Sequence, residues 1–307
     1  MTEILVLAIV NLLIVMFFGP LFEGVVRKYV RANIAHSRVG PLVGIWQPFL
    51  DLFKLLSKED LEVSGTPVML QRLAPVICLG SILAASLLLP ITGKAPLDAG
   101  GDAIVFLYLT GIGAVAIIIG AMATGSPFAY AGATREMMLF LIVEPVLLIA
   151  ILAVAVSSRS LRFMDMLMWH LTRGPSLGML IAAIAVLMSL QAHFGKVPFD
   201  IPEAEQEIIG GPFIEMSGPK LALFKWAIWC RQFVFASLLV TIFVPWGRVG
   251  IPVVDAIITL LKILVVYVLV SLIEVVNPRV RIDQALRFYL VMVITATIGL
   301  AIAYVVG

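Results

Sequence analysis

Five carboxylates are concentrated in one polar stretch, residues 196–220, which lies between two long apolar runs. The stretch reads KVPFDIPEAEQEIIGGPFIEMSGPK, and its acidic residues are Asp200, Glu203, Glu205, Glu207 and Glu215. Carboxylates at or inside a membrane are costly, and they commonly mark sites that bind ions or transfer protons. The stretch therefore predicts a proton-handling site. A capping box formed by Asp200 and Glu203 is the alternative for Asp200, but it leaves the other three carboxylates unexplained.

Three more charged residues lie inside the apolar runs themselves. Glu136 and Glu144 share one face of a predicted helix, and Pro145 frees a backbone carbonyl one turn before it. Lys262 lies near the centre of another apolar run. Burial and opposite charges shift pKa values so that neighbouring groups can exchange protons. We expect Glu136, Glu144 and Lys262 to extend the proton relay, and a static buried salt bridge is the alternative.

The composition identifies the class of protein. Of 307 residues, 62% are hydrophobic and 13% are charged, whereas soluble domains have about 45–50% apolar and about 25% charged residues. The chain is therefore predicted to be a polytopic membrane protein. Cys78 and Cys230 lie in different apolar runs, and neither they nor the three histidines have the spacing of metal ligands. We expect no metal or other cofactor in this chain.

The apolar segments predict an all-α fold with about eight transmembrane helices and amphipathic helices in the cytoplasmic loops, formed by a single membrane domain, 1–307. A spanning helix needs roughly 20 apolar residues. The predicted spans are approximately 3–28, 70–91, 102–123, 134–156, 176–195, 220–245, 253–276 and 286–306. The odd-numbered connections and their flanks hold 15 of the 21 Lys and Arg residues, and the opposite side holds 5. The positive-inside rule then places the 196–220 loop in the cytoplasm and both termini outside, in the inner cell membrane.

The first cytoplasmic connection, residues 30–68, contains a helical pattern of apolar residues. Phe49, Leu52, Phe53 and Leu56 recur at the spacing of one helix face. This pattern predicts an amphipathic helix that lies in the membrane interface or against another protein. Packing on the chain's own membrane domain fits the periodicity equally well.

Four motifs, in this order and spacing, resemble one family of membrane subunits. They are RVGP at 38–41 with WQPFLDLFKLLSKE following, GATRE to VEP at 132–145, PFDIPEAEQE to SGPKLALF at 198–224, and RVRIDQ at 279–284. The chain resembles the subunit shared by respiratory complex I, where it forms the subunit 1 family, and the group 4 energy-converting nickel–iron hydrogenases. The resemblance covers nearly the whole chain.

The resemblance implies a membrane anchor that joins a peripheral redox arm to ion-pumping subunits and holds no redox centre itself. The implied partners are a hydrogenase large subunit and a small iron–sulfur subunit, which would carry the nickel–iron and iron–sulfur centres, together with antiporter-like membrane subunits and the lipid bilayer, but no nucleic acid. The residues implied to dock the peripheral arm are Arg38, Gly40, Pro41, Arg279, Arg281 and Asp283.

Two departures favour the hydrogenase branch, which includes formate hydrogenlyase. Complex I relatives typically carry a glutamate in the sixth span, where Ile228 stands here, and a tyrosine in the acidic loop, where Met216 stands here. Both departures argue against quinone reduction. A complex I type subunit of a quinone-reducing site and a stand-alone ion transporter remain the alternative functions, and a sulfur-reducing complex of the same family is a further one.

Overall fold

The computed structural model describes residues 2–32, 43–62, 65–98 and 101–306. Throughout these segments the regular elements are helices. In chain order they are α1 (Thr2–Val26), the π-helix η1 (Arg27–Ala32), α2 (Val43–Leu56), α3 (Val68–Ser86), α4 (Asp102–Met122), α5 (Pro127–Ser158), α6 (Phe163–Arg173), α7 (Leu177–His193), α8 (Glu205–Ile208), the 3-10 helix η2 (Gly211–Phe213), α9 (Gly218–Phe243), α10 (Pro252–Val276) and α11 (Ile282–Val306).

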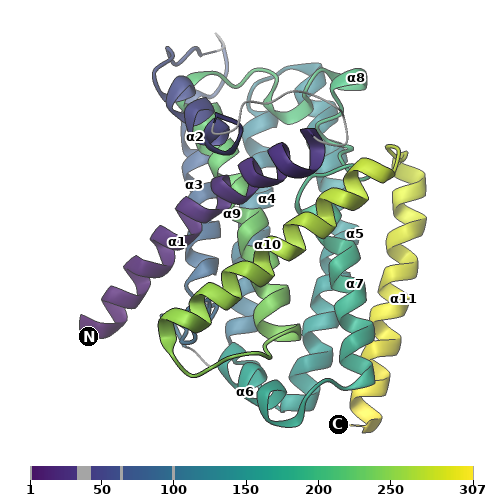
Figure 1. Ribbon diagram of the computed structural model, residues 1–307. Coiled ribbons are helices and arrows are strands. Elements are labelled where there is room, and N and C mark those ends of the chain that lie inside the picture. The colour runs from purple at the N-terminus through teal and green to yellow at the C-terminus, as the bar shows by residue number, and fades with distance from the viewer. Residues whose placement is uncertain (1, 33–42, 63–64, 99–100, 307) are drawn as a thin grey trace.

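Seven helices in the described part of the chain are long and apolar enough to cross a membrane: α1, α3, α4, α5, α9, α10 and α11. The predicted segment 176–195 corresponds to α7, whose 17 residues are at the lower limit of about 17 for a spanning helix. In Figure 1, α7 runs beside α5 and α11, and both termini lie at the end of the bundle opposite α2 and α8. The predicted all-helical membrane fold is confirmed.

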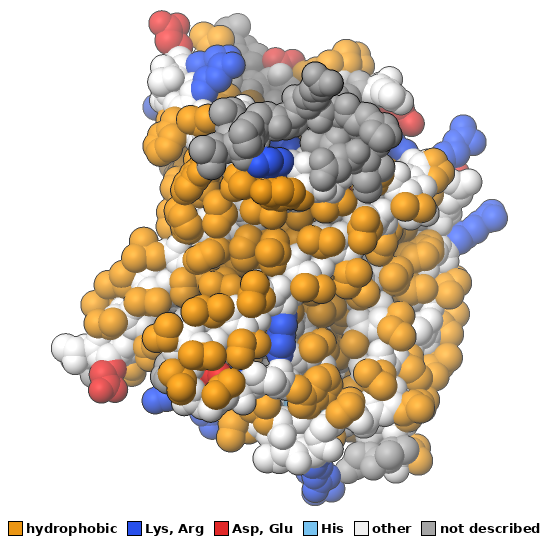
Figure 2. All heavy atoms as spheres, in the orientation of Figure 1, with side chains coloured by type: hydrophobic (Ala, Val, Ile, Leu, Met, Phe, Trp, Pro, Cys, Tyr) orange, Lys and Arg blue, Asp and Glu red, His pale blue; other side chains and the backbone are white. Residues whose placement is uncertain are grey.

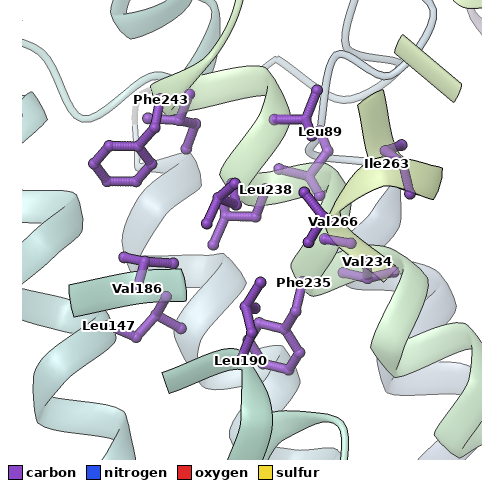
Figure 3. Packing of buried hydrophobic residues seen from close by; sticks show 14 of the residues in the cluster. Leu89, Leu147, Val186, Leu190, Val234, Phe235, Leu238, Phe243, Ile263 and Val266 are labelled. Carbon is purple, nitrogen blue, oxygen red and sulfur yellow. The ribbon is translucent and has the colours of Figure 1, made fainter. Parts of the chain in front are cut away.

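Helix α9 forms the centre of the bundle. Most of its side chains from Cys230 to Phe243 are buried, because other helices surround it. Figure 3 shows Phe235 and Leu238 of α9 close to Leu190 of α7 and Leu147 of α5. A helix that is apolar on every face is stable only when lipid or protein surrounds it completely. The central position of α9 from Cys230 onward places Arg231 inside the protein.

The outer helices expose apolar side chains around the bundle. On α10, Val253, Leu261 and Val265 are all more than half exposed. Figure 2 shows these surfaces as a broad hydrophobic belt, with most charged side chains at the two ends. An apolar belt of this extent is expected where lipid surrounds a protein. The charged ends mark the two membrane surfaces.

The amphipathic helix predicted within 30–68 is α2, and it packs on the chain's own membrane domain. Its Leu52 is buried, and the ring of Phe49 lies 5.5 Å from that of Phe17 on α1. The two helices approach so closely at Gly24 that a Cβ atom there would lie 2.0 Å from the Ile45 carbonyl oxygen. Phe53 on another face of α2 remains exposed. Packing on the chain itself therefore accounts for only part of the apolar surface of α2.

Candidate functional site

The acidic loop, predicted at 196–220, occupies residues 194–217 between α7 and α9 and folds back onto the end of the bundle. Its apolar residues Phe199 and Ile201 are buried, and the Phe199 ring lies 4.7 Å from that of Tyr289 on α11. The backbone N–H of Val280 donates a hydrogen bond of 3.1 Å to the carbonyl of Pro198. These contacts fix the backbone of the loop, so that its carboxylates have defined positions at the membrane surface.

Asp200 is held by a tertiary ion pair. Its carboxylate lies 2.7 Å from the guanidinium of Arg279, on the connection between α10 and α11. Burial raises the pKa of Asp200, and the positive charge of Arg279 opposes this rise. The capping alternative is wrong, because α8 begins at Glu205, its N-cap is Ala204, and no side chain caps it. The pairing with Arg279 has replaced the local contact that the spacing suggested.

Glu203 is a loop carboxylate whose pKa is strongly raised. Burial raises its pKa from 4.5 to about 7, and the negative charges of Asp200 and Glu136 add to the rise. The positive charges of Arg231 and Lys196 oppose it. A carboxyl group with a pKa near 7 gains and loses its proton at physiological pH, as a proton-transferring group must.

A buried ion pair lies deeper in the bundle. Glu136 of α5 and Arg231 of α9 approach to 3.5 Å, and their side chains are only 15% and 12% exposed. A charge as deep as Arg231 requires an acidic partner, and the structure identifies it as Glu136. Both members of the pair influence the pKa of Glu203, so the acidic loop and the pair are electrostatically coupled.

A small cavity, here called the inner chamber, adjoins this pair. Its volume is about 30 Å³, and its polar lining consists of Glu136, Glu144, His193, Arg231 and Thr110. A cavity needs roughly 10–15 Å³ to hold a water molecule, so the inner chamber has room for one. The buried Arg231 Nε and His193 Nε2 atoms lack a hydrogen-bond partner among the described residues. A water molecule in the inner chamber would satisfy such atoms.

The other predicted relay carboxylates lie at the surface of the acidic loop. Glu207 is exposed and pairs with Arg135 at 2.6 Å. Glu215 is also exposed. Glu205 begins α8, and its side chain lies outside what the structure describes. The structure thus brings Glu136, Glu144 and Glu203 together around Arg231 and leaves Glu207 and Glu215 in contact with solvent.

Lys262 does not lie with these carboxylates. Its ammonium group donates hydrogen bonds to the backbone carbonyls of Val244, at 3.0 Å, and Trp246. Both carbonyls belong to the connection between α9 and α10, at the end of the bundle opposite the acidic loop (Figure 1). The expectation of a lysine beside the mid-membrane carboxylates is therefore corrected: the partners of Lys262 are backbone carbonyls.

The predicted docking residues fall into two groups. Arg38, Gly40 and Pro41 lie outside the described residues. Arg281 and Asp283 are exposed at the same end of the bundle as the acidic loop, whereas Arg279 is partly covered through its pair with Asp200. The exposed residues remain available for contact with a partner at this surface.

With this geometry in view, the comparisons identify the family. Residues 3–305 match the family model described as NADH dehydrogenase. The chain belongs to the NADH dehydrogenase subunit 1 family. The resemblance drawn from the four motifs is thereby confirmed.

Several relatives within this family are components of hydrogenase complexes. The chain is 36% identical to Hydrogenase-4 component C of Escherichia coli K12, over 88% of this chain and 87% of that protein. It is 33% identical to Formate hydrogenlyase subunit 4 of the same organism, over 90% and 91%. A chain of the archaeal membrane-bound sulfane sulfur reductase, a respiratory membrane complex, has 30% identity and a TM-score of 0.89, covering 98% of this chain and 99% of that one.

Two polar residues near the site, Glu23 and His193, were not predicted as site residues from the sequence. Glu23 of α1 forms an ion pair of 2.7 Å with Lys196, and both side chains are nearly buried. His193 lines the inner chamber and stacks on Phe235 with ring centres 4.0 Å apart. A carboxylate near the end of the first apolar run was a usable signal for Glu23. The place of His193 depends on how α7 packs against α9, which no local pattern shows.

Within the described segments no cluster of three or more His, Cys, Asp or Glu residues could hold a metal ion. Cys78 and Cys230 are buried and free, in α3 and α9. Each lies in an apolar cluster, as expected for cysteines that act as small hydrophobic residues.

Proposed function

We propose that this chain is the membrane anchor and proton-coupling subunit of a respiratory complex of the group 4 nickel–iron hydrogenase type. The observation that carries the proposal is the series of ionisable groups that leads from the acidic loop into the interior of the bundle. It begins at Glu203 in the acidic loop, passes through the Glu136–Arg231 pair, and ends at Glu144 on the wall of the inner chamber. The sequence identity of this chain to components of two hydrogenase complexes supports the same assignment.

In the proposed mechanism, electron transfer in the peripheral arm changes the charge or conformation next to Glu203. Because the pKa of Glu203 is about 7, a modest change in the local field is enough to load or release its proton. The change in charge alters the balance of the Glu136–Arg231 pair, since a buried charge is strongly affected by its neighbours. The resulting change in the local electric field reaches Glu144 at the far side of the inner chamber, and Glu144 passes it to antiporter-like subunits. Lys262 is left out of this route because its partners are backbone carbonyls.

The proposal places the acidic-loop end in the cytoplasm and both termini outside, following the distribution of basic residues. A nickel–iron large subunit and an iron–sulfur small subunit would then dock at this end, where Arg281 and Asp283 are exposed. In this arrangement the partners hold the redox centres, and this chain provides the anchor and the coupling groups.

Replacing Glu144 with glutamine in the intact complex tests the coupling role. We expect Glu144→Gln to abolish ion transport during turnover in membrane vesicles, while hydrogenase activity with an artificial dye stays at the wild-type level. Glu215→Gln is the matched control, because Glu215 is exposed in the acidic loop and should leave both activities unchanged. Wild-type ion transport by Glu144→Gln, or loss of the complex from the membrane, would refute the coupling role.

The similarity to a chain of a sulfane sulfur reductase supports a second candidate, a sulfur-reducing complex. Nickel and iron analysis of the complex purified in mild detergent distinguishes the two. Nickel together with abundant iron supports the hydrogenase assignment. Iron without nickel supports the sulfur-reducing one or, if quinone is bound, the complex I branch.

A further inference from the structure

A large apolar groove opens on the membrane-facing side of the bundle between α3, α4 and α5. Its volume is about 820 Å³, and its lining includes Leu73, Tyr108, Gly111 and Leu141. Tyr108 is 73% exposed and Leu141 is 60% exposed, so these walls are open to a neighbour within the membrane. Gly111 lines the groove beside Phe140, and a Cβ atom added at Gly111 would lie 3.3 Å from the tip of the Phe140 ring. The missing side chain therefore leaves space in the groove.

One carboxylate, that of Glu144, lines this otherwise apolar groove. Glu144 forms no ion pair among the described residues, and it also lines the inner chamber. The next residue, Pro145, lines the groove and has no N–H, so the Leu141 carbonyl loses its usual helical donor. The groove wall thus presents a carboxylate within a hydrophobic surface, one residue before a proline that leaves a backbone carbonyl without its helical donor.

This chemistry restricts what fills the groove. A lipid chain matches the apolar walls but offers no donor to the carboxylate, which is costly to leave facing hydrocarbon. A membrane-spanning helix matches the same walls and can also present a charged donor, because ionisable side chains inside membranes pair with one another. Charge complementarity therefore favours a protein helix that carries a cation at the depth of Glu144.

We propose that the groove between α3, α4 and α5 seats a membrane-spanning helix of a partner subunit, which places a lysine or arginine against Glu144. The inference rests on the proposed function in treating this chain as one subunit of a larger membrane complex. It adds a defined contact through which the inner chamber reaches that partner. Glu144 then stands between a cation on each side: Arg231 across the chamber and the partner's side chain in the groove.

Photo-crosslinking in the intact complex tests the contact. Tyr108 is replaced by the photoreactive residue p-benzoylphenylalanine, and Tyr304 of α11, which is 76% exposed, is replaced in the same way as the control. We expect Tyr108 to give one discrete protein adduct, which mass spectrometry assigns to a membrane-spanning segment of another subunit containing a lysine or arginine. We expect no adduct with that segment from Tyr304. Adducts of Tyr108 with phospholipid alone, with a second copy of this chain, or with a segment lacking a basic residue would each overturn the proposal.

Filling the groove gives an independent measurement. Gly111→Leu adds a side chain inside the groove and should reduce the partner recovered with this chain at least tenfold. Gly80→Leu, on α3 where a Cβ meets nothing within 4 Å, should leave recovery unchanged. Wild-type recovery with Gly111→Leu contradicts the proposal.

The two proposals can fail separately. If Glu144→Gln stops ion transport but Tyr108 yields only lipid adducts, the groove contact is wrong and the coupling role stands. If the Tyr108 adduct forms but Glu144→Gln keeps full ion transport, the contact stands and the coupling role is wrong.

Discussion

Replacing Glu203 with glutamine should change how the stability of this protein depends on pH. In the folded protein, burial and the charges of Asp200 and Glu136 raise the pKa of Glu203 from 4.5 to about 7. As the pH rises above the lower value, the unfolded chain releases this proton while the folded chain retains it. The folded state therefore loses stability through this window, and the loss is complete once the pH exceeds the folded pKa.

The size of the effect follows from the two pKa values. One pKa unit corresponds to about 1.4 kcal/mol, and linkage makes the wild type roughly 2 kcal/mol less stable at about pH 8.5 than at about pH 5.5 because of this residue. Glu203→Gln cannot ionise, so it should lack this contribution. Because Glu203 is only partly buried, solvent screening reduces the difference, and about 1–2 kcal/mol is the expected change.

The assay is unfolding of the purified chain in mixed micelles as the fraction of denaturing detergent increases, at both pH values. For each protein we take the difference in unfolding free energy between the two pH values. The informative quantity is this difference in the wild type minus that in Glu203→Gln, because contributions from other groups cancel. Glu215→Gln is the matched control from the same loop and should keep the wild-type difference, since Glu215 is exposed. A Glu203→Gln variant with the full wild-type pH dependence would show that the buried position of Glu203 does not control its protonation.

Two further predictions concern packing and the buried pair. Arg231→Ala leaves Glu136 partly buried without its cation and should lower the free energy of unfolding by about 3–5 kcal/mol in the same assay. The double variant Glu136→Gln with Arg231→Gln should recover much of this loss. An Arg231→Ala variant as stable as the wild type would contradict the pairing. Gly24→Ala forces α2 away from α1 and should lower the free energy of unfolding by about 1–3 kcal/mol. Gly80→Ala, whose added Cβ meets open space, should lower it far less. Equal losses for the two variants would refute this account.

The spanning helices could be predicted from sequence because hydropathy over about 20 residues reports directly on the cost of burying polar groups in lipid. The pairing of Arg231 with Glu136 could not be predicted from the sequence, because it depends on which faces of α5 and α9 meet across 95 residues of chain. Glu144 was recognised from its position beside Pro145, but its place between the inner chamber and the groove depends on packing.

Sequence reasoning was least successful where a long-range contact replaced a local one. Asp200 and Glu203 had the spacing of a capping box, but Asp200 pairs with Arg279 and the short helix begins later, at Glu205. Lys262 was placed correctly on α10, yet the carbonyls of Val244 and Trp246 hold its ammonium group. Hydropathy gives the depth of a charge in the membrane, whereas only the fold gives its neighbours.

The apolar core beyond Glu144 has an electrical consequence for the proposed relay. From Glu144 to the end of α5 the helix carries only apolar residues and two serines, Ser157 and Ser158, over roughly 21 Å at 1.5 Å per residue. Phe235 and Leu238 of α9 continue this apolar layer in the packed core (Figure 3). Such a layer acts as an insulator, so a large share of the transmembrane voltage falls across it. In the proposed relay a proton on Glu144 has crossed only part of this voltage, and the rest of the electrical work, which is about 2.3 kcal/mol per 100 mV for a full crossing, falls to the subunits beside it.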